Sequence, residues 1–329
     1  ILDELIRWID KPGGIRYKFR MPSVAQTIES NISKIVRGKA GIVRQALLCL
    51  FSEGHLLIED VPGVGKTTLA LALARSLGLS FQRIQFTSDL LPSDILGVSV
   101  FNSNSGAFEF KPGPIFHHVV LADEINRSTP KTQSALLEAM NERQVSMDNL
   151  TRPLPEPFFV IATQNPHEHY GTYPLPESQL DRFLMRISIG YPDREHELEI
   201  LRDEIDIRSV EKLEPVARKE DVFECVRTAR AVRVDPSLDE YILAIVGETR
   251  ESPFLEIGAS PRGAIALRRA AQAGAFVEGR DYLVPDDVKG AAPAVLSHRV
   301  IVKSLNGGSD PGRSETIVRE ILERVSVPM

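Results

Sequence analysis

The sequence predicts an α/β domain followed by a smaller, all-helical domain, and three observations support this. In the first half, short apolar runs alternate with helical patterns, as strands buried between helices do. After about residue 191 only helical patterns remain. At 329 residues the chain is also long for a single domain. We therefore expect an extension at residues 1–23, an α/β core at 24–191 and a helical domain at 192–329.

The expected elements follow from the apolar pattern and its interruptions. Tyr191-Pro192-Asp193 interrupts it and marks the domain boundary. Two polar-tipped hairpins are expected around residues 97–110 and 145–153. The expected strands are residues 55–58, 81–86, 115–122, 158–162 and 184–189. The expected helices are residues 24–35, 40–51, one opening at Lys66, 130–142, 194–206, 219–229, 236–251, 261–277, 285–296 and 315–324.

Composition narrows the class of protein. The chain is 43% hydrophobic and 26% charged, which is typical of globular proteins with a large core. A net charge of −6 gives no basic footprint and argues against a dedicated nucleic-acid binder. Cys49 and Cys225 form no C-x-x-C pair, so we expect reduced core residues and a cytoplasmic location. No apolar run approaches a membrane span, and no signal peptide is visible.

The turn after the first expected strand has the composition of a phosphate-binding loop. Gly63 and Gly65 allow backbone N–H groups to approach phosphates closely, and the following helix N-terminus favours negative charge. In the pattern G-x-x-x-x-G-K-[ST], Lys66 reaches the β- and γ-phosphates and Thr67 supplies a hydroxyl to Mg²⁺. Asp60 replaces the first glycine, and aspartate tolerates left-handed turns. An ordinary turn with a surface lysine is the weaker interpretation. The expected nucleotide-binding residues of this loop are Pro62, Gly63, Val64, Gly65, Lys66, Thr67 and Thr68.

Polar residues that end the third and fourth expected strands indicate catalysis. Asp123 and Glu124 follow an apolar run some distance after the phosphate-binding loop. Asp123 would hold the Mg²⁺ together with Thr67, and Glu124 would polarise the water that attacks the γ-phosphate. Two acids that merely cap a strand are the alternative. Asn165 follows the next strand, where it could contact both the γ-phosphate and the water.

Three further residues are candidates for nucleotide contacts. Arg262 lies in the first turn of an expected helix, after Ser260 as N-cap and Pro261. An arginine there is a poor match to the helix dipole, so we expect it to face an anion such as the γ-phosphate. Ile35 and Val36 lie in a turn before the phosphate-binding loop and are expected adenine contacts. Plain packing between two helices explains these two residues equally well.

Together, these residues resemble the MoxR family of AAA+ ATPases, over about residues 28–302. The resemblance rests on LLIEDVPGVGKTTLA, ADEINRSTPKTQSALLEAMNERQV, IATQNPHEHYGTYPLPESQLDRF and GASPRGAIALRRAA. It implies that Asn165 is the sensor 1 residue, Arg182 the arginine finger and Arg262 the sensor 2 arginine. The hairpins near residues 97–111 and 145–153 correspond to the helix-2 insert and the hairpin before sensor 1.

The resemblance also implies an architecture and a role. It implies a parallel five-stranded α/β core with an all-α lid, assembled as a homo-oligomeric, hexameric ring that uses ATP and Mg²⁺. It implies chaperone-like remodelling or maturation of protein complexes, including insertion of metal cofactors. The implied partners are a protein client and a von Willebrand factor A-domain protein. The position of Arg182 supports a ring independently. It comes after a strand far from the phosphate-binding loop, and an arginine there reaches a neighbour's γ-phosphate more easily than its own.

Three other functions are open at this point. Related ring motors act on nucleic acids, but the expected hairpin tip, residues 102–106, carries no lysine or arginine to meet phosphates. A transcriptional activator would present a GAF loop, which Gly106-Ala107-Phe108 resembles and Glu109-Phe110 interrupts. A scaffold without hydrolysis is disfavoured by the intact catalytic candidates. The alternation of Phe101, Phe108 and Phe110 predicts that some of these rings pack inward.

Overall fold

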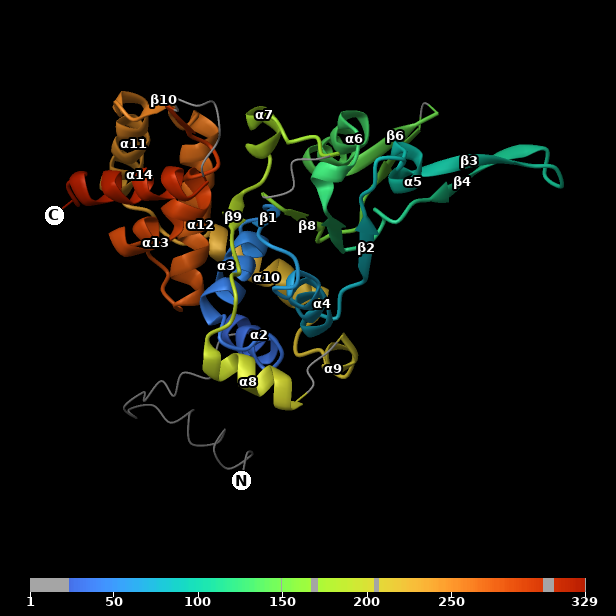
Figure 1. The fold of residues 1–329 in the computed structure, drawn as a ribbon, viewed down its shortest axis with the longest axis horizontal. Helices are drawn as coiled ribbons and strands as arrows, with labels where there is room; N and C mark the ends of the chain where they lie inside the picture. The colour runs from blue at the N-terminus through green and yellow to red at the C-terminus, as the bar shows by residue number, and fades with distance from the viewer. Residues whose placement is uncertain (1–23, 149, 167–170, 204–206, 304–310, 329) are drawn as a thin grey trace, which may run out of the picture.

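The structure is a computed structural model that describes residues 24–148, 150–166, 171–203, 207–303 and 311–328. An α/β core occupies the middle of the molecule, with a helical lid on one side and a projecting hairpin on the opposite side (Figure 1). The expected extension at residues 1–23 lies outside the described residues. Within the described ranges, no helix has both the length and the apolar character needed to cross a membrane.

The core is built on one parallel sheet with the strand order β2-β5-β8-β1-β9. Its strands are short and mostly buried, because a parallel sheet is covered by helices on both faces. The five parallel strands implied by the resemblance are therefore confirmed. The strands are β1 (Leu56–Glu59), β2 (Phe81–Gln85), β5 (Val119–Asp123), β8 (Phe159–Gln164) and β9 (Met185–Ile187).

Two helical layers enclose this sheet. Successive side chains of a strand point to opposite faces, so Leu56 and Ile58 join one hydrophobic cluster and Leu57 joins the other. The first cluster includes α2 (Val24–Ser33), α3 (Ala40–Phe51) and α4 (Lys66–Ser76). The second includes α5 (Pro92–Leu96) and α6 (Pro130–Glu142). Two short helices, η1 (Ile125–Arg127) and α7 (Glu177–Leu180), complete the core.

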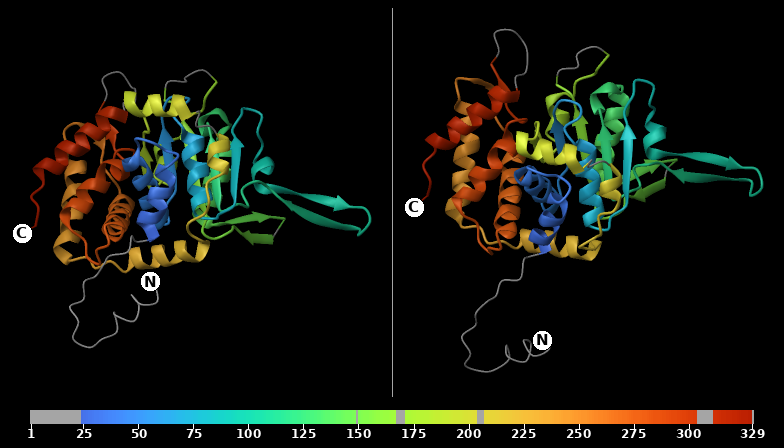
Figure 2. Two further views of the ribbon diagram at one scale, coloured as in Figure 1. Left: turned by 90° about the horizontal axis from the view of Figure 1, so that it is seen from below. Right: turned by 60° about the horizontal axis from the view of Figure 1, so that its bottom comes forward.

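Both expected hairpins are present. They are β3 (Gly97–Asn102) with β4 (Ala107–Pro112), and β6 (Gln144–Met147) with β7 (Leu150–Pro153). The β3–β4 hairpin extends away from the core, on the side opposite the lid, in both views of Figure 2.

The phenylalanines of the long hairpin only partly pack inward. Phe110 lies against Phe116 with ring centroids 5.8 Å apart. Phe101 and Phe108 are paired in register and stack edge to face at 5.4 Å, yet they are 55% and 73% exposed. The prediction that some of these rings pack inward is therefore confirmed for Phe110, and it does not extend to Phe101 and Phe108. A projecting two-stranded hairpin has no layer beneath its outer half, so the rings can bury surface only against each other.

In the part of the lid that the structure describes there are helices and one small antiparallel strand pair. Four of its helices begin with proline, whose fixed φ suits the first helical position. The pair β10–β11 was not expected, because strands of two or three residues are too short to show a period.

The segment after residue 191 first packs on the core, with α9 on α4 and α10 on α2 and α3. The elements are α8 (Arg194–Asp203), α9 (Ile207–Glu211), α10 (Lys219–Arg230), α11 (Pro236–Glu251), β10 (Leu255–Ile257), α12 (Pro261–Val277), α13 (Pro285–Leu296), β11 (Ile301–Val302) and α14 (Pro311–Arg324).

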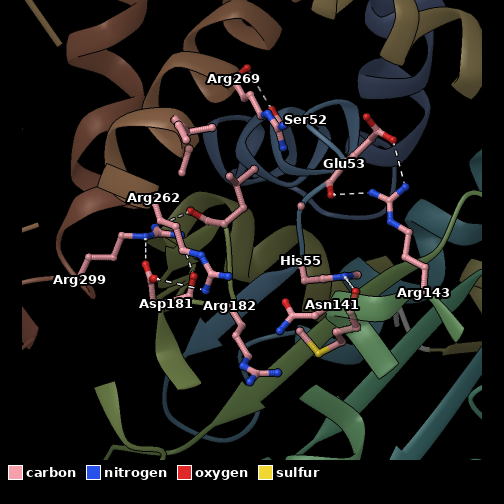
Figure 3. A pocket seen from close by; sticks show the side chains of 15 residues that line it. Ser52, Glu53, His55, Asn141, Arg143, Asp181, Arg182, Arg262, Arg269 and Arg299 are labelled. Carbon is pink, nitrogen blue, oxygen red and sulfur yellow. Dashed lines mark hydrogen bonds and ion pairs between the residues drawn. The ribbon is translucent and has the colours of Figure 1, made fainter. Parts of the chain in front are cut away.

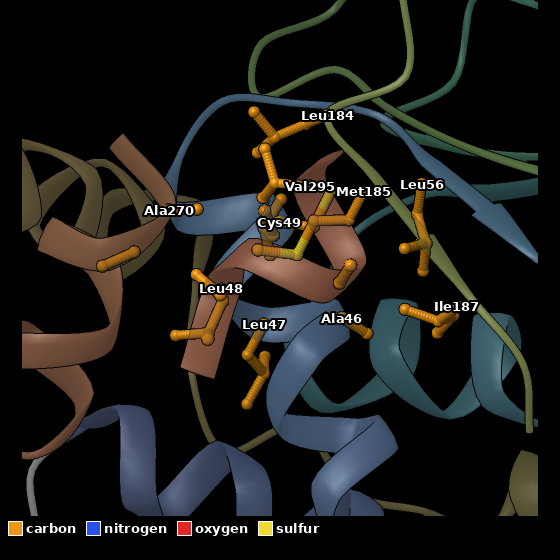
Figure 4. Close-up of a cluster of buried hydrophobic side chains, with 14 of the residues drawn as sticks. Ala46, Leu47, Leu48, Cys49, Leu56, Leu184, Met185, Ile187, Ala270 and Val295 are labelled. Atoms are coloured by element: carbon orange, nitrogen blue, oxygen red, sulfur yellow. The ribbon is translucent and has the colours of Figure 1, made fainter. Parts of the chain in front are cut away.

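Core and lid share a continuous hydrophobic cluster. Leu48 and Cys49 of α3 are buried together with Ala270 of α12 and Val295 of α13, and Met185 of β9 joins them (Figure 4). Cys49 is a free, fully buried thiol whose pKa burial raises well above its usual range, so it acts as a packing residue. The lid is therefore anchored to the core through α3 and β9.

A buried arginine reinforces this anchor. Arg299, which follows α13, is only 4% exposed in its side chain, and its Nε donates to Asp181 Oδ1 at 2.8 Å. Its Nη2 donates to the Phe183 carbonyl at 2.6 Å and its Nη1 to the Leu184 carbonyl at 3.0 Å. One lid side chain thus fixes the segment that joins α7 to β9.

Replacing this arginine is expected to destabilise the protein strongly. Arg299→Met should lower the free energy of unfolding by about 3 kcal/mol, because Asp181 and two carbonyls lose their buried donor. Arg268→Met is the matched control: its ion pair with Asp239 is exposed (43% and 45%), so the loss should be below about 1 kcal/mol. Urea denaturation followed by circular dichroism measures both. Equal losses in the two variants would contradict the role of Arg299.

Candidate active site

The phosphate-binding loop joins β1 to α4 at the carboxyl edge of the sheet. Gly63 and Gly65 have φ values of +84° and +91°, which side-chain-bearing residues rarely adopt. A Cβ added at either glycine would meet no atom within 4 Å, so the space in front of the loop is open. Thr67 and Thr68 lie in the first turn of α4, which contains no acidic residue. The loop therefore fits the triphosphate of a nucleotide on observed geometry.

Lys66 lies between the loop and the end of β8. Its Nζ donates to the Asp60 carbonyl and, at 3.5 Å, to the Gln164 carbonyl. Burial lowers the pKa of Lys66, while four surrounding carboxylates act to raise it, those of Asp60, Asp123, Glu124 and Glu59. Asn165 follows Gln164 directly and is 9% exposed. The loop, the end of β5 and the end of β8 thus converge on one place.

The two catalytic carboxylate candidates are organised by Thr163 of β8. Its hydroxyl donates to Asp123 Oδ1 at 2.6 Å and accepts from the backbone N–H of Glu124 at 2.9 Å. Glu124 has a φ of +57°, a left-handed conformation that costs about 1–3 kcal/mol in a residue with a side chain. Such a conformation persists only where neighbouring groups fix it, and here the hydrogen bond from the Glu124 N–H to Thr163 does so. Sequence reasoning missed this threonine, although its position at the end of a strand beside β5 could have indicated it.

Two exposed residues of the edge strand β2 also contact these carboxylates. Arg83 Nη2 lies 2.6 Å from Asp123 Oδ2, and Gln85 Nε2 donates to Glu124 Oε2 at 2.6 Å. Arg127 adds an ion pair to the same Glu124 oxygen at 3.3 Å. Gln85 and Arg127 thus both contact the same carboxylate oxygen of Glu124. In the sequence, the signal for Arg83 and Gln85 as site residues was weak, because they are only polar residues at alternate positions of an edge strand.

The expected adenine contacts lie near the start of the lid. The turn that contains Ile35 and Val36 follows α2, and both side chains pack against the main hydrophobic cluster. In the same turn Lys39 donates to the Tyr191 carbonyl at 2.8 Å, so it adjoins the connection from β9 to α8. A role in adenine binding stays a prediction for these two residues.

The two expected arginines are not part of this convergence. Arg182 and Arg262 line a separate cavity of about 290 Å³, together with His55 and Leu184 (Figure 3). His55 and Leu184 precede β1 and β9, whereas the phosphate-binding loop follows β1, so the cavity lies at the opposite edge of the parallel sheet. A four-residue strand separates these edges by about 13 Å. Arg262 therefore lies away from its own loop, 4.0 Å from Asp181 Oδ2 and with its side chain 71% exposed.

The cavity is rich in arginine. Arg182 Nη1 donates to the Leu137 carbonyl at 2.9 Å, which directs this side chain across the end of α6. Besides these two, the lining includes Arg143, Arg269 and Arg299, of which Arg143 and Arg299 form ion pairs with Glu53 and Asp181. The five arginines outnumber the two carboxylates of the lining, Glu53 and Asp181, so the cavity has a surplus of positive charge.

Comparison with known proteins identifies the family. A model of the ATPase family associated with various cellular activities (AAA) matches residues 55–185, and an AAA lid domain model matches residues 247–321. Chaperone MoxR1 of Mycobacterium tuberculosis is 39% identical over 90% of this chain and 80% of its own length. The chain belongs to the MoxR family of AAA+ ATPases. YeaC of Bacillus subtilis is 50% identical to this MoxR-family chain, and the match covers 94% of this chain and 96% of YeaC. A crystal structure from Cytophaga hutchinsonii superposes with a TM-score of 0.85 at 40% identity, covering 93% of this chain and 95% of the other.

Membership gives the reaction of this protein. This MoxR-family chain hydrolyses ATP, and its loop, Asp123, Glu124, Asn165 and Arg182 all fall within the matched ATPase domain. Arg262 falls within the matched lid domain. The fold predicted from the sequence, an AAA+ core with a helical lid, is confirmed.

Proposed function

We propose that the chain is a ring-forming chaperone that couples ATP hydrolysis to the remodelling of protein complexes. The observation that carries the proposal is the separation of Arg182 and Arg262 from the phosphate-binding loop of their own chain. An arginine contributes to phosphoryl transfer only when it reaches the γ-phosphate. A complete site therefore needs a second copy, and a closed ring supplies one to every subunit.

Within each site, the chain's own residues have distinct tasks. Lys66 and the loop N–H groups hold the β- and γ-phosphates, and Asn165 and Glu124 orient and polarise the attacking water. Thr67 and Asp123 would hold Mg²⁺, which would neutralise charge on the phosphates. Arg182 and Arg262 of the adjacent copy would approach the γ-phosphate from the other side of the interface.

The name of the relative MoxR1 supports a chaperone role. The finer proposals rest on the family resemblance alone: a hexameric ring, a von Willebrand factor A-domain partner, assistance with metal-cofactor insertion and a cytoplasmic location. No observation favours a nucleic-acid motor, because residues 102–106 at the tip of the exposed hairpin carry no positive charge.

The β3–β4 hairpin is the proposed contact with the client. Its outer half exposes Phe101 and Phe108, and its base is fixed by a hydrogen bond between Ser99 and Asp148 and by Arg152 over the Phe110 ring, 3.9 Å from its centroid. A rigid base with exposed aromatic rings at the far end suits a lever that transmits motion to an apolar segment of a client.

Shortening this hairpin is expected to separate ATP hydrolysis from client action. Replacing residues 102–106 by a two-residue turn should leave folding, ATP binding and basal hydrolysis within about threefold of wild type, since the tip buries almost nothing. Stimulation of hydrolysis by unfolded casein should be lost. Leu150→Ser on the second hairpin is the control and should keep the stimulation.

Two results would contradict this assignment. Full stimulation of the shortened variant would move the client contact elsewhere, and a collapse of its basal hydrolysis would make the hairpin part of the ring interface. A DNA-binding titration at several salt concentrations, with and without ATP, tests the nucleic-acid alternative in the same preparations.

A further inference from the structure

Asp60 stands at the first position of the phosphate-binding loop, where the general pattern has glycine. The residue is only 8% exposed. A buried carboxylate is stable only when donors surround it. Here Oδ2 accepts from Ser188 Oγ at 2.9 Å, from Ile189 N–H at 2.7 Å and from Gly190 N–H at 2.6 Å. Oδ1 accepts from Val61 N–H at 2.8 Å.

Three of these four donors belong to one segment, residues 188–190. This segment joins β9, the last strand of the core sheet, to α8, the first helix of the connection toward the lid. Burial acts to raise the pKa of Asp60, but the hydrogen bonds from Gly190, Ser188, Val61 and Ile189 outweigh it, and the pKa is lowered. The carboxylate is therefore ionised at neutral pH and holds this segment with charge-assisted bonds.

The main chain of the same residue contacts the phosphate-binding lysine. The Asp60 carbonyl accepts a hydrogen bond from Lys66 Nζ. Phosphates bound in the loop compete for this same ammonium group. Asp60 thus contacts the phosphate-binding lysine through its backbone and the core–lid connection through its side chain.

The preceding residue repeats the connection to β9. Glu59 pairs with Arg186 of β9 at 3.2 Å, and both side chains are nearly buried, 12% and 13% exposed. Arg186 Nη2 in turn donates to Ser314 Oγ of α14 at 3.2 Å. Both acidic residues before the loop are therefore linked to the strand and segment that lead into the lid.

We propose that Asp60 is a positioning residue that transmits the state of the phosphate-binding loop to residues 188–190, and through them to the lid. The inference rests on ATP binding at the loop, which belongs to the proposed site. A glycine at this position would form the same turn but would leave the three donors of residues 188–190 without their acceptor. The replacement of glycine by aspartate thus adds a mechanical link that the loop itself does not need.

The test compares Asp60→Gly, Asp60→Asn and Ser188→Ala with the wild type. For each protein, a fluorescent ATP analogue measures affinity, steady-state kinetics give kcat and KM, and hydrogen exchange of residues 188–199 is followed with and without nucleotide. Asp60→Gly should bind ATP within about threefold of wild type but lose about tenfold in kcat, because the misplaced lid no longer completes the site. Its exchange at residues 188–199 should no longer respond to nucleotide.

The other variants separate coupling from simple structural support. Asp60→Asn keeps one oxygen toward residues 188–190 and should recover most of kcat and of the exchange response. Ser188→Ala removes one donor without touching the loop and should lower kcat about threefold. Asp193→Asn is the control, since Asp193 accepts from His196 N–H at 3.0 Å in the same connection without contacting the loop. It should match wild type in every readout.

Two results would overturn the coupling. One is an Asp60→Gly protein with wild-type kcat and an intact exchange response. The other is an Asp60→Gly protein that loses ATP affinity while Ser188→Ala behaves as wild type, since Asp60 would then only shape the loop. If the wild type itself failed to bind ATP, the proposed site would fall together with the coupling, which distinguishes that failure from the first two.

Discussion

Glu124→Gln is expected to keep ATP bound while hydrolysis falls by two orders of magnitude or more, about the contribution of a positioned general base. Glutamine fills the same volume, so the hydrogen bond from the Glu124 N–H to Thr163 at 2.9 Å and the left-handed backbone should persist. The amide cannot polarise or accept a proton from the attacking water. Single-turnover hydrolysis and titration with a fluorescent ATP analogue measure the two properties separately.

The contrast with two other variants makes this result specific. Glu138→Gln changes an exposed carboxylate of α6 and should hydrolyse ATP at the wild-type rate. Lys66→Ala should instead abolish ATP binding, because it removes the charge that holds the β- and γ-phosphates. Near-normal turnover by Glu124→Gln would show that another group activates the water.

The sequence predicted the features that depend on local chemistry. Continuous apolar runs identified β1, β5 and β8, because strands buried on both faces leave no room for polar alternation, whereas the alternating run at residues 81–86 identified the edge strand β2. Proline at the first helical position located the starts of α11, α12 and α13. Gly63 and Gly65 were recognised from the phosphate-binding pattern, and their positive φ values show a further reason for glycine at both positions. These signals lie within a few residues of the structure that they determine.

The remaining features depend on contacts between distant segments. Thr163, Arg83 and Gln85 surround the carboxylates of Asp123 and Glu124 only because β8 and β2 flank β5 in the sheet. Strand order is not written in any local pattern, so the sequence offered only weak signals for these residues: a polar strand end for Thr163 and polar alternation for Arg83 and Gln85. The exposure of Phe101 and Phe108 had the same origin, since alternation shows that two rings share a face but not whether another layer covers them.

The position of Arg262 shows most clearly what could not be predicted from the sequence. Its place in the first helical turn predicted that it faces an anion, which stays a prediction, and the structure places it on a cavity lined by further arginines. Which copy supplies the anion depends on how the lid packs on the core. Arg299, the buried cluster on α3 and the contacts of β9 set that packing, and none of them resembles a motif.

Arg182→Ala is expected to lower the rate of hydrolysis about 10³-fold or more while nucleotide affinity stays close to wild type, the usual effect of losing an arginine supplied by a neighbour. Its side chain lies at the edge of the sheet opposite the loop of its own chain, so its loss leaves the loop intact. Arg75→Ala, on α4, is the surface control. Steady-state hydrolysis and ATP-analogue titration measure the effect.

Mixing inactive subunits tests whether the site is shared. Arg182→Ala and Lys66→Ala proteins, each inactive alone, should regain activity together, because some interfaces then join an intact loop to an intact arginine. Native mass spectrometry confirms that mixed assemblies form. Absence of recovery at every ratio, with mixed assembly confirmed, would contradict a shared site.

A second mixture decides where Arg262 acts. If Arg182 and Arg262 serve the same neighbouring site, Arg262→Ala should also recover activity with Lys66→Ala. Arg262→Ala and Arg182→Ala should not rescue each other, because no subunit in that mixture carries both arginines. If Arg262 acted on the nucleotide of its own chain, this last mixture would regain activity, since an Arg182→Ala subunit keeps its loop and Arg262 while its neighbour supplies Arg182. Arg182 and Arg262 line the same cavity in Figure 3, so we expect no activity from the mixture of Arg262→Ala and Arg182→Ala proteins.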